Sequence, residues 1–240
     1  MILAAGRGER MRPLTDSTPK PLLQVRGKPL IEWHTDALAA GGFRRLVINT
    51  AWLGEQIPAH FEGSALSLAW SHEGADFGGA LETAGGIARA LPLLGDVFWV
   101  LAGDVFVPDF EFTQAAVDRF VASGKLAHLW LVPNPAHNTK GDFGLSADGL
   151  ALNLPATSTE PRYTFSTIGI YRKALFDGLP FGNPAGIKAP LAPLLRHAMD
   201  NQQVSAELYE KAWTDVGTPE RLKELNNPTP AIHATTSHTS

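Results

Sequence analysis

Two kinds of hydrophobic pattern alternate along the first 130 residues of the chain. Apolar runs of strand length are separated by stretches in which apolar residues recur every three or four positions, as in an amphipathic helix. The expected strands are 1–5, 45–49, 66–71, 96–101 and 128–132, and the expected helices are 30–40, 53–61, 83–91 and 113–123. Strands that are apolar throughout and alternate with helices predict a mostly parallel sheet with helices on both faces.

The second half of the chain has a different order of patterns. It reads as a hairpin at 145–154, a strand at 165–171, a helix at 189–199, a strand at 204–213 and a last helix at 219–225. We predict an α/β fold with a Rossmann-like mixed, mostly parallel sheet and a small α+β lid on that sheet. Residues 1–226 are expected to form a single domain. Residues 227–240 are small, polar and proline-bearing, which is typical of a flexible tail.

Composition narrows the class of protein further. The net charge of −4 argues against a nucleic-acid partner, which usually meets a basic surface. The chain has no cysteine, so disulfides and thiol catalysis are excluded, and a cytoplasmic location is favoured. Its longest apolar runs are far shorter than a membrane span, and no export signal is visible. We therefore expect a soluble protein, monomeric or weakly homo-oligomeric, whose partners are small-molecule substrates.

The loop after the first strand is rich in glycine and in cations. Gly6 and Gly8 follow an apolar run, Arg10 and Arg12 come next, and Lys20 lies between two prolines. Glycines allow φ > 0 and let backbone N–H groups approach a phosphate chain closely. We therefore predict a polyanion-binding loop in which both glycines adopt positive φ.

Two common phosphate-binding loops are excluded by spacing. A Walker A loop needs four residues between its glycines and a Gly-Lys-Ser/Thr end, which this loop lacks. A dinucleotide-binding loop needs a third small residue where this chain has Met11, and a ribose-binding acid about 20 residues later. The nearest acid, Glu32, lies inside a helical pattern.

The loop closely resembles the signature of the sugar-1-phosphate nucleotidyltransferases, L-A-A-G-x-G-x-R followed by P-x-T and P-K-P. The matching residues are Leu3, Ala4, Ala5, Gly6, Gly8, Arg10, Pro13, Thr15, Pro19, Lys20 and Pro21. The resemblance implies a fold of the nucleotidyltransferase or glycosyltransferase-A type. It implies that Arg10 and Lys20 are catalytic cations. The nucleotide contacts that it implies in this loop are Leu3, Ala5, Gly6, Arg7, Gly8, Glu9 and Lys20.

Two aspartates are candidates for holding Mg²⁺, which prefers one or two carboxylates and otherwise binds water and phosphate oxygens. Asp104 directly follows an apolar strand, and ligands of open α/β sheets bind at such strand ends. It resembles the aspartate of the family's L-x-G-D element, and Asp215 resembles that of W-x-D-x-G-T. The alternatives are a turn residue for Asp104 and a helix N-cap for Asp215, although Thr218 is closer to the cap position.

A small-residue turn at 79–86 resembles the turn with which the family reads the nucleobase. The resemblance implies base contacts from Glu82, Ala84 and Gly85, and further contacts from Glu73 at the preceding strand end. The alternatives are that Thr83 caps a helix and that the two glutamates are solvated acids.

The sugar-side candidates lie in the second half of the chain. The segment 141–144 with Gly144, then Glu160, then the strand 164–171 occur in the order of the family's sugar pocket. The family often has Glu-Lys-Pro where this chain has Glu-Pro-Arg, so the usual lysine is absent. Arg162 or Lys188 would then bind the sugar phosphate, with a surface cation as the alternative for each.

The resemblance implies in-line attack of a sugar phosphate on the α-phosphorus of a nucleoside triphosphate, with pyrophosphate leaving and no covalent intermediate. The segments 52–57, 82–86 and 165–171 are most similar to members that join UTP to N-acetylmuramate 1-phosphate in peptidoglycan recycling. Glucose 1-phosphate and mannose 1-phosphate remain alternative substrates. A non-catalytic, nucleotide-sensing regulatory subunit is the alternative from another class of protein.

Overall fold

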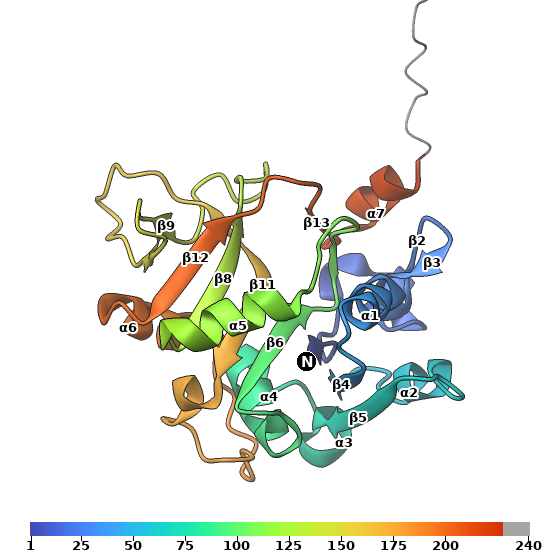
Figure 1. Ribbon diagram of the computed structural model, residues 1–240. Coiled ribbons are helices and arrows are strands. Elements are labelled where there is room, and N and C mark those ends of the chain that lie inside the picture. The colour runs from blue at the N-terminus through green and yellow to red at the C-terminus, as the bar shows by residue number, and fades with distance from the viewer. Residues whose placement is uncertain (228–240) are drawn as a thin grey trace, which may run out of the picture.

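The computed structural model describes residues 1–227 and centres on a sheet of seven strands (Figure 1). The strands, in spatial order, are β12 (Val204–Leu208), β8 (Ala127–Val132), β11 (Thr164–Arg172), β6 (Val97–Ala102), β1 (Ile2–Leu3), β4 (Arg45–Thr50) and β5 (Ser67–His72). β11 runs antiparallel to both of its neighbours, and every other pairing in this sheet is parallel. The predicted mixed, mostly parallel α/β sheet is confirmed.

Helices cover both faces of the sheet, as Figure 1 shows for α5, which crosses in front of it. The α-helices are α1 (Leu30–Ala40), α2 (Gln56–His60), α3 (Glu73–Phe77), α4 (Glu82–Ala90), α5 (Gln114–Ser123), α6 (Leu191–Asp200) and α7 (Pro219–Asn226). Short 3-10 helices occur at Glu9–Met11, Leu14–Asp16, Lys20–Leu22, Leu91–Leu93 and Lys173–Phe176. Among residues 1–227, no helix has the length and apolar character that crossing a membrane would require.

Two hydrophobic clusters explain why the strands are apolar throughout. On β6, Phe98 and Val100 point into one cluster with residues of α4 and α6, and Trp99 and Leu101 point into the other with residues of α1 and α5. Successive side chains of a strand face opposite sides of the sheet. A strand buried on both sides therefore needs an apolar residue at every position.

Several predicted elements have different bounds in the structure. The expected helix 53–61 shortens to α2, and the expected helix 189–199 starts at Leu191 because Pro190 is extended at its N-cap. The expected strand 204–213 ends at Leu208. The chain then leaves the sheet and returns at β13 (Thr214–Asp215), which pairs with β7 (Val105–Phe106).

The part of the second half that lies off the main sheet is smaller than the lid we expected. β11 and β12 join the main sheet, so the off-sheet pairing in this half, besides β7–β13, is a hairpin of β9 (Gly144–Leu145) and β10 (Ala151–Leu152). A further hairpin, β2 (Gln24–Val25) with β3 (Lys28–Pro29), lies near the N-terminus. The predicted tail falls outside the described residues from position 228 onward.

Candidate active site

Two neighbouring cavities open at the carboxyl ends of the central strands. Cavity A, of about 230 Å³, is lined by the end of β1 and the loop behind it, together with Lys20, Asn49, Glu73 and Asp104. Cavity B, of about 520 Å³, is lined by residues of β6, β11 and α6. Both cavities share Leu3, Glu82, Thr83 and Ala102 in their walls. The parallel strands thus place two binding spaces side by side at one edge of the sheet, where open α/β sheets bind ligands.

The glycine-rich loop approaches cavity A through its backbone. Gly8 has φ of 69°, and a Cβ there would lie 2.9 Å from the Thr15 methyl group. Gly6 lines the cavity with open space where its side chain would be, but its φ is not positive, so our prediction for Gly6 was wrong. Gly8 makes the turn, and Gly6 leaves room beside the backbone.

The predicted arginines and acid of this loop lie in different surroundings. The Arg7 guanidinium carbon lies 3.5 Å from the centroid of the Trp52 ring, and its Nη1 donates to the Thr15 carbonyl at 3.0 Å. Arg7 and Glu9 also form an ion pair of 3.7 Å. Arg10 is exposed. The structure therefore ties Arg7 into the loop itself and leaves Arg10 facing solvent.

Lys20 and Asp104 form the most buried cation–carboxylate contact at the floor of cavity A. The Lys20 Nζ lies 2.6 Å from an Asp104 carboxylate oxygen, and only 9% of the lysine side chain is exposed against 39% of the aspartate side chain. A 3-10 helix begins at Lys20 within the Pro-Lys-Pro segment, and this helix fixes the backbone conformation from which the lysine side chain extends. The two residues are far apart in sequence, and the sheet brings them together.

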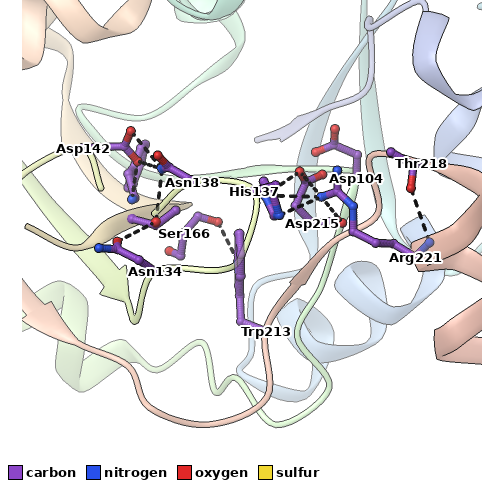
Figure 2. Close-up of polar contacts among 12 residues, drawn as sticks. Asp104, Asn134, His137, Asn138, Asp142, Ser166, Trp213, Asp215, Thr218 and Arg221 are labelled. Atoms are coloured by element: carbon purple, nitrogen blue, oxygen red, sulfur yellow. Dashed lines mark hydrogen bonds and ion pairs between the residues drawn. The ribbon is translucent and has the colours of Figure 1, made fainter. Parts of the chain in front are cut away.

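Asp215 lies beside Asp104 because of a short β-ladder. In the β7–β13 pair, Asp215 is the partner of Val105, and the Val216 N–H donates to the Asp104 carbonyl at 2.9 Å. Trp213 anchors the approach to this ladder by donating its indole N–H to the Ser166 carbonyl at 3.0 Å (Figure 2). Thr218, and not Asp215, caps α7 by accepting the Arg221 N–H. The cap alternative for Asp215 is therefore wrong.

A cation also holds Asp215. Figure 2 shows Arg221 and His137 converging on the Asp215 carboxylate. The Arg221 Nη1 lies 2.7 Å from Asp215 Oδ2 and also donates to the Asp215 carbonyl at 2.9 Å, while the His137 Nε2 lies 3.3 Å from Oδ2. A Cβ on Gly217 would lie 2.9 Å from the Arg221 guanidinium and from the Asp215 carboxylate. Glycine at this position therefore lets the two side chains pair without having to shift.

Asp104 and Asp215 offer carboxylate oxygens, the ligand type that a hard divalent cation such as Mg²⁺ prefers. Asp215 lies in β13 and Asp104 directly precedes β7, the strand paired with β13. Each carboxylate engages a cation through Oδ2, and both side chains are partly exposed. Among the described residues, no group of three or more His, Asp or Glu side chains is arranged to hold a metal ion. Two carboxylates suffice for Mg²⁺ when water and phosphate oxygens complete its shell.

Glu73 is a buried structural acid. Its carboxylate accepts from the Asn49 side-chain amide at 2.7 Å and from the Leu81 N–H at 2.8 Å. Asn49 in turn accepts the Ala4 N–H at 2.8 Å. Burial raises the pKa of Glu73, and these two hydrogen bonds oppose the rise. The network joins the end of β1 to the turn before α4, so Glu73 shapes the wall of cavity A.

The predicted base-reading residues divide into two groups. Glu82 is exposed and lines both cavities. Ala84 and Gly85 are buried, and both of their N–H groups donate to the Ala189 carbonyl. A Cβ on Gly85 would lie 2.4 Å from the Ile187 carbonyl oxygen. Ala84 and Gly85 therefore have a packing role in the structure. The alternative that Thr83 caps a helix is not supported, because α4 begins at Glu82 without a side-chain cap.

Of the four predicted sugar-side residues, none lines either cavity. Gly144 is packed in β9, where a Cβ would lie 2.6 Å from a Leu154 methyl group. The Arg162 guanidinium donates to the carbonyls of Leu154 and Pro155. Glu160 and Lys188 are exposed. The interpretation of Arg162 and Lys188 as ligands of the sugar phosphate is therefore not supported by their positions.

Cavity B is lined by parts of the predicted sugar-side segments 141–144 and 164–171, and by Arg196, which the sequence analysis did not single out. Arg196 reaches it from α6, and Asp142 lies in its wall with the carboxylate held by the Phe165 N–H at 2.8 Å and by Asn138 (Figure 2). Thr167 lies at the irregularity of β11 with φ of 68°. Positive φ in a β-branched residue is a strained conformation that clusters at functional sites. Such strain depends on sheet register, so a pattern of residue types does not reveal it.

Comparison with known proteins identifies the relatives of this chain. The family described as nucleotidyl transferase matches residues 1–231. An N-acetylmuramate alpha-1-phosphate uridylyltransferase of Neisseria meningitidis is 52% identical over 93% of this chain and 95% of its own length, and one of Caulobacter vibrioides is 32% identical over 92% of each. A structure from Bacillus anthracis, described as a glucose-1-phosphate thymidylyltransferase, superposes with a TM-score of 0.73 at 21% identity, covering 94% of this chain and 92% of its own.

Proposed function

This chain belongs to the nucleotidyl transferase family, and we propose that it joins UTP to N-acetylmuramate 1-phosphate, releasing pyrophosphate and forming a UDP-sugar for peptidoglycan recycling. The observation that carries the proposal is the 52% identity, over nearly the whole of both chains, to a uridylyltransferase with that substrate. A second relative with the same printed activity spans the chain equally well. The geometry of the two cavities supports the same reaction.

The nucleotide would occupy cavity A. The cavity is lined by backbone of the glycine-rich loop, which suits a phosphate chain, and by the turn at Ala80 and Glu82, which suits a base edge. The sugar phosphate would occupy cavity B. Because both cavities share Leu3, Ala102, Glu82 and Thr83, the two substrates would meet above that common wall. Holding two reactants in contact geometry is a large part of catalysis in such transfers.

In the proposed step, an oxygen of the sugar phosphate attacks the α-phosphorus in line with the bond to the departing pyrophosphate. One P–O bond forms and the α–β phosphoanhydride bond breaks. The Lys20 ammonium, at the floor of cavity A, would balance negative charge on the phosphates. Arg10 extends from the glycine-rich loop into solvent and would bind the outer phosphates that leave. Positioned cations of this kind stabilise charge that develops in the transition state.

Asp104 and Asp215 would hold Mg²⁺. When bound, the ion would neutralise charge on the phosphate oxygens of the nucleotide. Lys20 and Arg221 occupy one oxygen of each carboxylate and so keep the two negative charges from repelling each other. Oδ1 of each aspartate takes no part in these ion pairs and would be the atom that holds the metal.

The experiment that tests the proposal is pyrophosphate release from five nucleotides against four sugar phosphates, with Mg²⁺ and with EDTA. The nucleotides are UTP, GTP, CTP, ATP and dTTP, and the sugars are the 1-phosphates of N-acetylmuramate, N-acetylglucosamine, glucose and mannose. We expect turnover with UTP and N-acetylmuramate 1-phosphate that EDTA abolishes. Preference for glucose 1-phosphate or mannose 1-phosphate would show that the proposed sugar substrate is wrong and would keep the reaction class. Silence from folded protein that still binds a nucleotide would favour a regulatory subunit.

A further inference from the structure

Cavity B holds one cationic side chain among the residues that line it, Arg196. Arg196 lies in the second turn of α6, four residues after Ala192, and residues four apart share a helix face. Side chains on a helix lean toward its N-terminus, so the guanidinium extends back over the first turn. Leu191 and Ala192 of that first turn also line cavity B. The helix therefore presents its positively polarised end and a guanidinium to the same space.

The Arg196 guanidinium is held in place without a carboxylate partner. Its Nη1 donates to the Asn153 side-chain carbonyl at 2.8 Å, and its central carbon lies 5.2 Å from the Phe143 ring centroid. Among the ion pairs within residues 1–227, none includes Arg196. One neutral contact uses one N–H of the five that an arginine carries. Donors therefore remain for a ligand in the cavity.

The chemistry of the cavity walls indicates where an anionic group would be placed. Asp142 and Glu82 also line cavity B, and each would repel a negatively charged group. The Asp142 carboxylate is already paired with N–H donors of Phe165 and Asn138. A carboxylate on the ligand would therefore be placed at the Arg196 end. A planar guanidinium matches a carboxylate in a bidentate pair, which a lysine ammonium does not.

We propose that Arg196 recognises a carboxylate on the sugar substrate, namely the lactyl group that distinguishes N-acetylmuramate 1-phosphate from N-acetylglucosamine 1-phosphate. The inference rests on the proposed function, because it needs a sugar with this group in cavity B. Arg162 and Lys188, the predicted ligands of the sugar phosphate, are not among the residues that line this cavity. Arg196 is a specificity residue that touches the substrate and takes no part in the phosphorus chemistry.

The test compares wild-type enzyme with Arg196→Gln and Arg196→Lys on both sugar phosphates. A hydrogen-bonded charge pair is worth roughly 10- to 100-fold, so we expect Arg196→Gln to lower kcat/KM for N-acetylmuramate 1-phosphate by about that factor. The loss should lie in the KM for this sugar, and the KM for UTP should be unchanged. Turnover of N-acetylglucosamine 1-phosphate should change by less than about threefold, and Arg196→Lys should recover part of the preference. Arg162→Gln is the matched control.

A modified substrate removes the same charge without changing the protein. When the lactyl carboxylate is converted to its amide, wild-type enzyme should lose the factor that Arg196→Gln loses, and the variant should be indifferent to the change, as a coupled pair requires. Two outcomes would overturn the role of Arg196 and leave the proposed function standing. One is an equal loss of kcat/KM on both sugars in Arg196→Gln, and the other is an amide penalty in Arg196→Gln as large as in the wild-type enzyme. Wild-type enzyme that does not use N-acetylmuramate 1-phosphate would overturn the proposed function and this inference together.

Discussion

The two cavities at the edge of the sheet are built in different ways. Cavity A takes most of its wall from backbone and small residues at 3–6 and 80–83, with Lys20 and Asp104 beneath them. Cavity B takes its wall from side chains on β6, β11 and α6. A phosphate chain is the same in every nucleotide, so backbone N–H groups and fixed cations are sufficient to bind it. Sugars differ in their substituents, and distinguishing them requires side chains.

This comparison predicts two classes of variant. Changes beneath cavity A should reduce turnover by the same factor for every sugar phosphate, because they act on the nucleotide and the charge at phosphorus. Changes in cavity B should alter the ratio between sugars, as proposed for Arg196. Point variants of residues in and around the two cavities can test this division.

Asp104→Asn and Asp215→Asn should have the largest effect. Each substitution replaces a carboxylate that would hold Mg²⁺ with a neutral amide, so we expect turnover to fall by about a thousandfold or more, as when preorganised charge stabilisation is lost. The fall should be equal for all active sugars. Pyrophosphate release at increasing Mg²⁺, together with Mn²⁺ binding followed by electron paramagnetic resonance, would measure it.

Asp109→Asn is the control for this pair, since Asp109 is exposed and lies five positions beyond Asp104. It should retain wild-type turnover. Retention of Mg²⁺-dependent activity by both Asp104→Asn and Asp215→Asn would show that the carboxylate pair has been assigned wrongly. A loss that differs between sugars would contradict the division between the cavities.

The same division explains how much the sequence could predict. The nucleotide side depends on local features, a glycine turn at Gly8 and a lysine between prolines, and these are visible as motifs. The positions of Asp104 and Asp215 could be expected from the strand ends and the resemblance, although only the β7–β13 ladder brings them together. Arg196 carries no local signal, because its importance comes from the packing of α6 over β6 and β11.

Two of the predicted site residues have contacts that depend on the fold. Arg162 lies two positions after Glu160, near the place of the family's lysine, yet the backbone carbonyls of Leu154 and Pro155 accept hydrogen bonds from its guanidinium. Packing restricts Gly85 to a small residue, because a Cβ there would lie 2.4 Å from the Ile187 carbonyl oxygen. Residue type reports that a position is constrained. The neighbour that constrains it is known only from the fold.

Glu73→Gln should have the next largest effect, a decrease in the stability of the fold. The glutamine can accept one hydrogen bond, but its amide N–H₂ would face either the Leu81 N–H or the Asn49 amide, leaving buried donors opposed. We expect a loss of about 2 kcal/mol in the free energy of unfolding, as for a buried polar group left unpaired. Chemical denaturation would measure the loss. Glu62→Gln, an exposed acid, should be neutral. An unchanged stability in Glu73→Gln would show that the Ala4–Asn49–Glu73–Leu81 network is not needed.

Arg221 lines neither cavity, and Arg221→Gln should have an intermediate effect on metal binding. It removes the cation that orients Asp215 at 2.7 Å, so the carboxylate would spend less time in the geometry seen beside Asp104. We expect Mn²⁺ affinity to fall by about tenfold, the range reported for partners that orient metal ligands. Exposed Arg119→Gln is the charge-matched control. An unchanged Mn²⁺ affinity in Arg221→Gln would assign Arg221 to the packing of α7 alone.

Substitutions of Glu82 should have the smallest effect, and they test the wall that the two cavities share. Glu82 has a φ of 59°, a left-handed conformation that favours glycine. The left-handed region costs a residue with a Cβ about 1 kcal/mol relative to glycine. Glu82→Gly should therefore be more stable than Glu82→Ala by about that amount in thermal or chemical unfolding, since the alanine keeps the strain and both lose the carboxylate. Equal stability of the two variants would mean that the turn relaxes when the carboxylate is removed, and that the glutamate itself imposes the conformation. If the strain is instead intrinsic to the turn, then the backbone between the two cavities is fixed by the fold, and the nucleotide and sugar sites can be changed independently on either side of it.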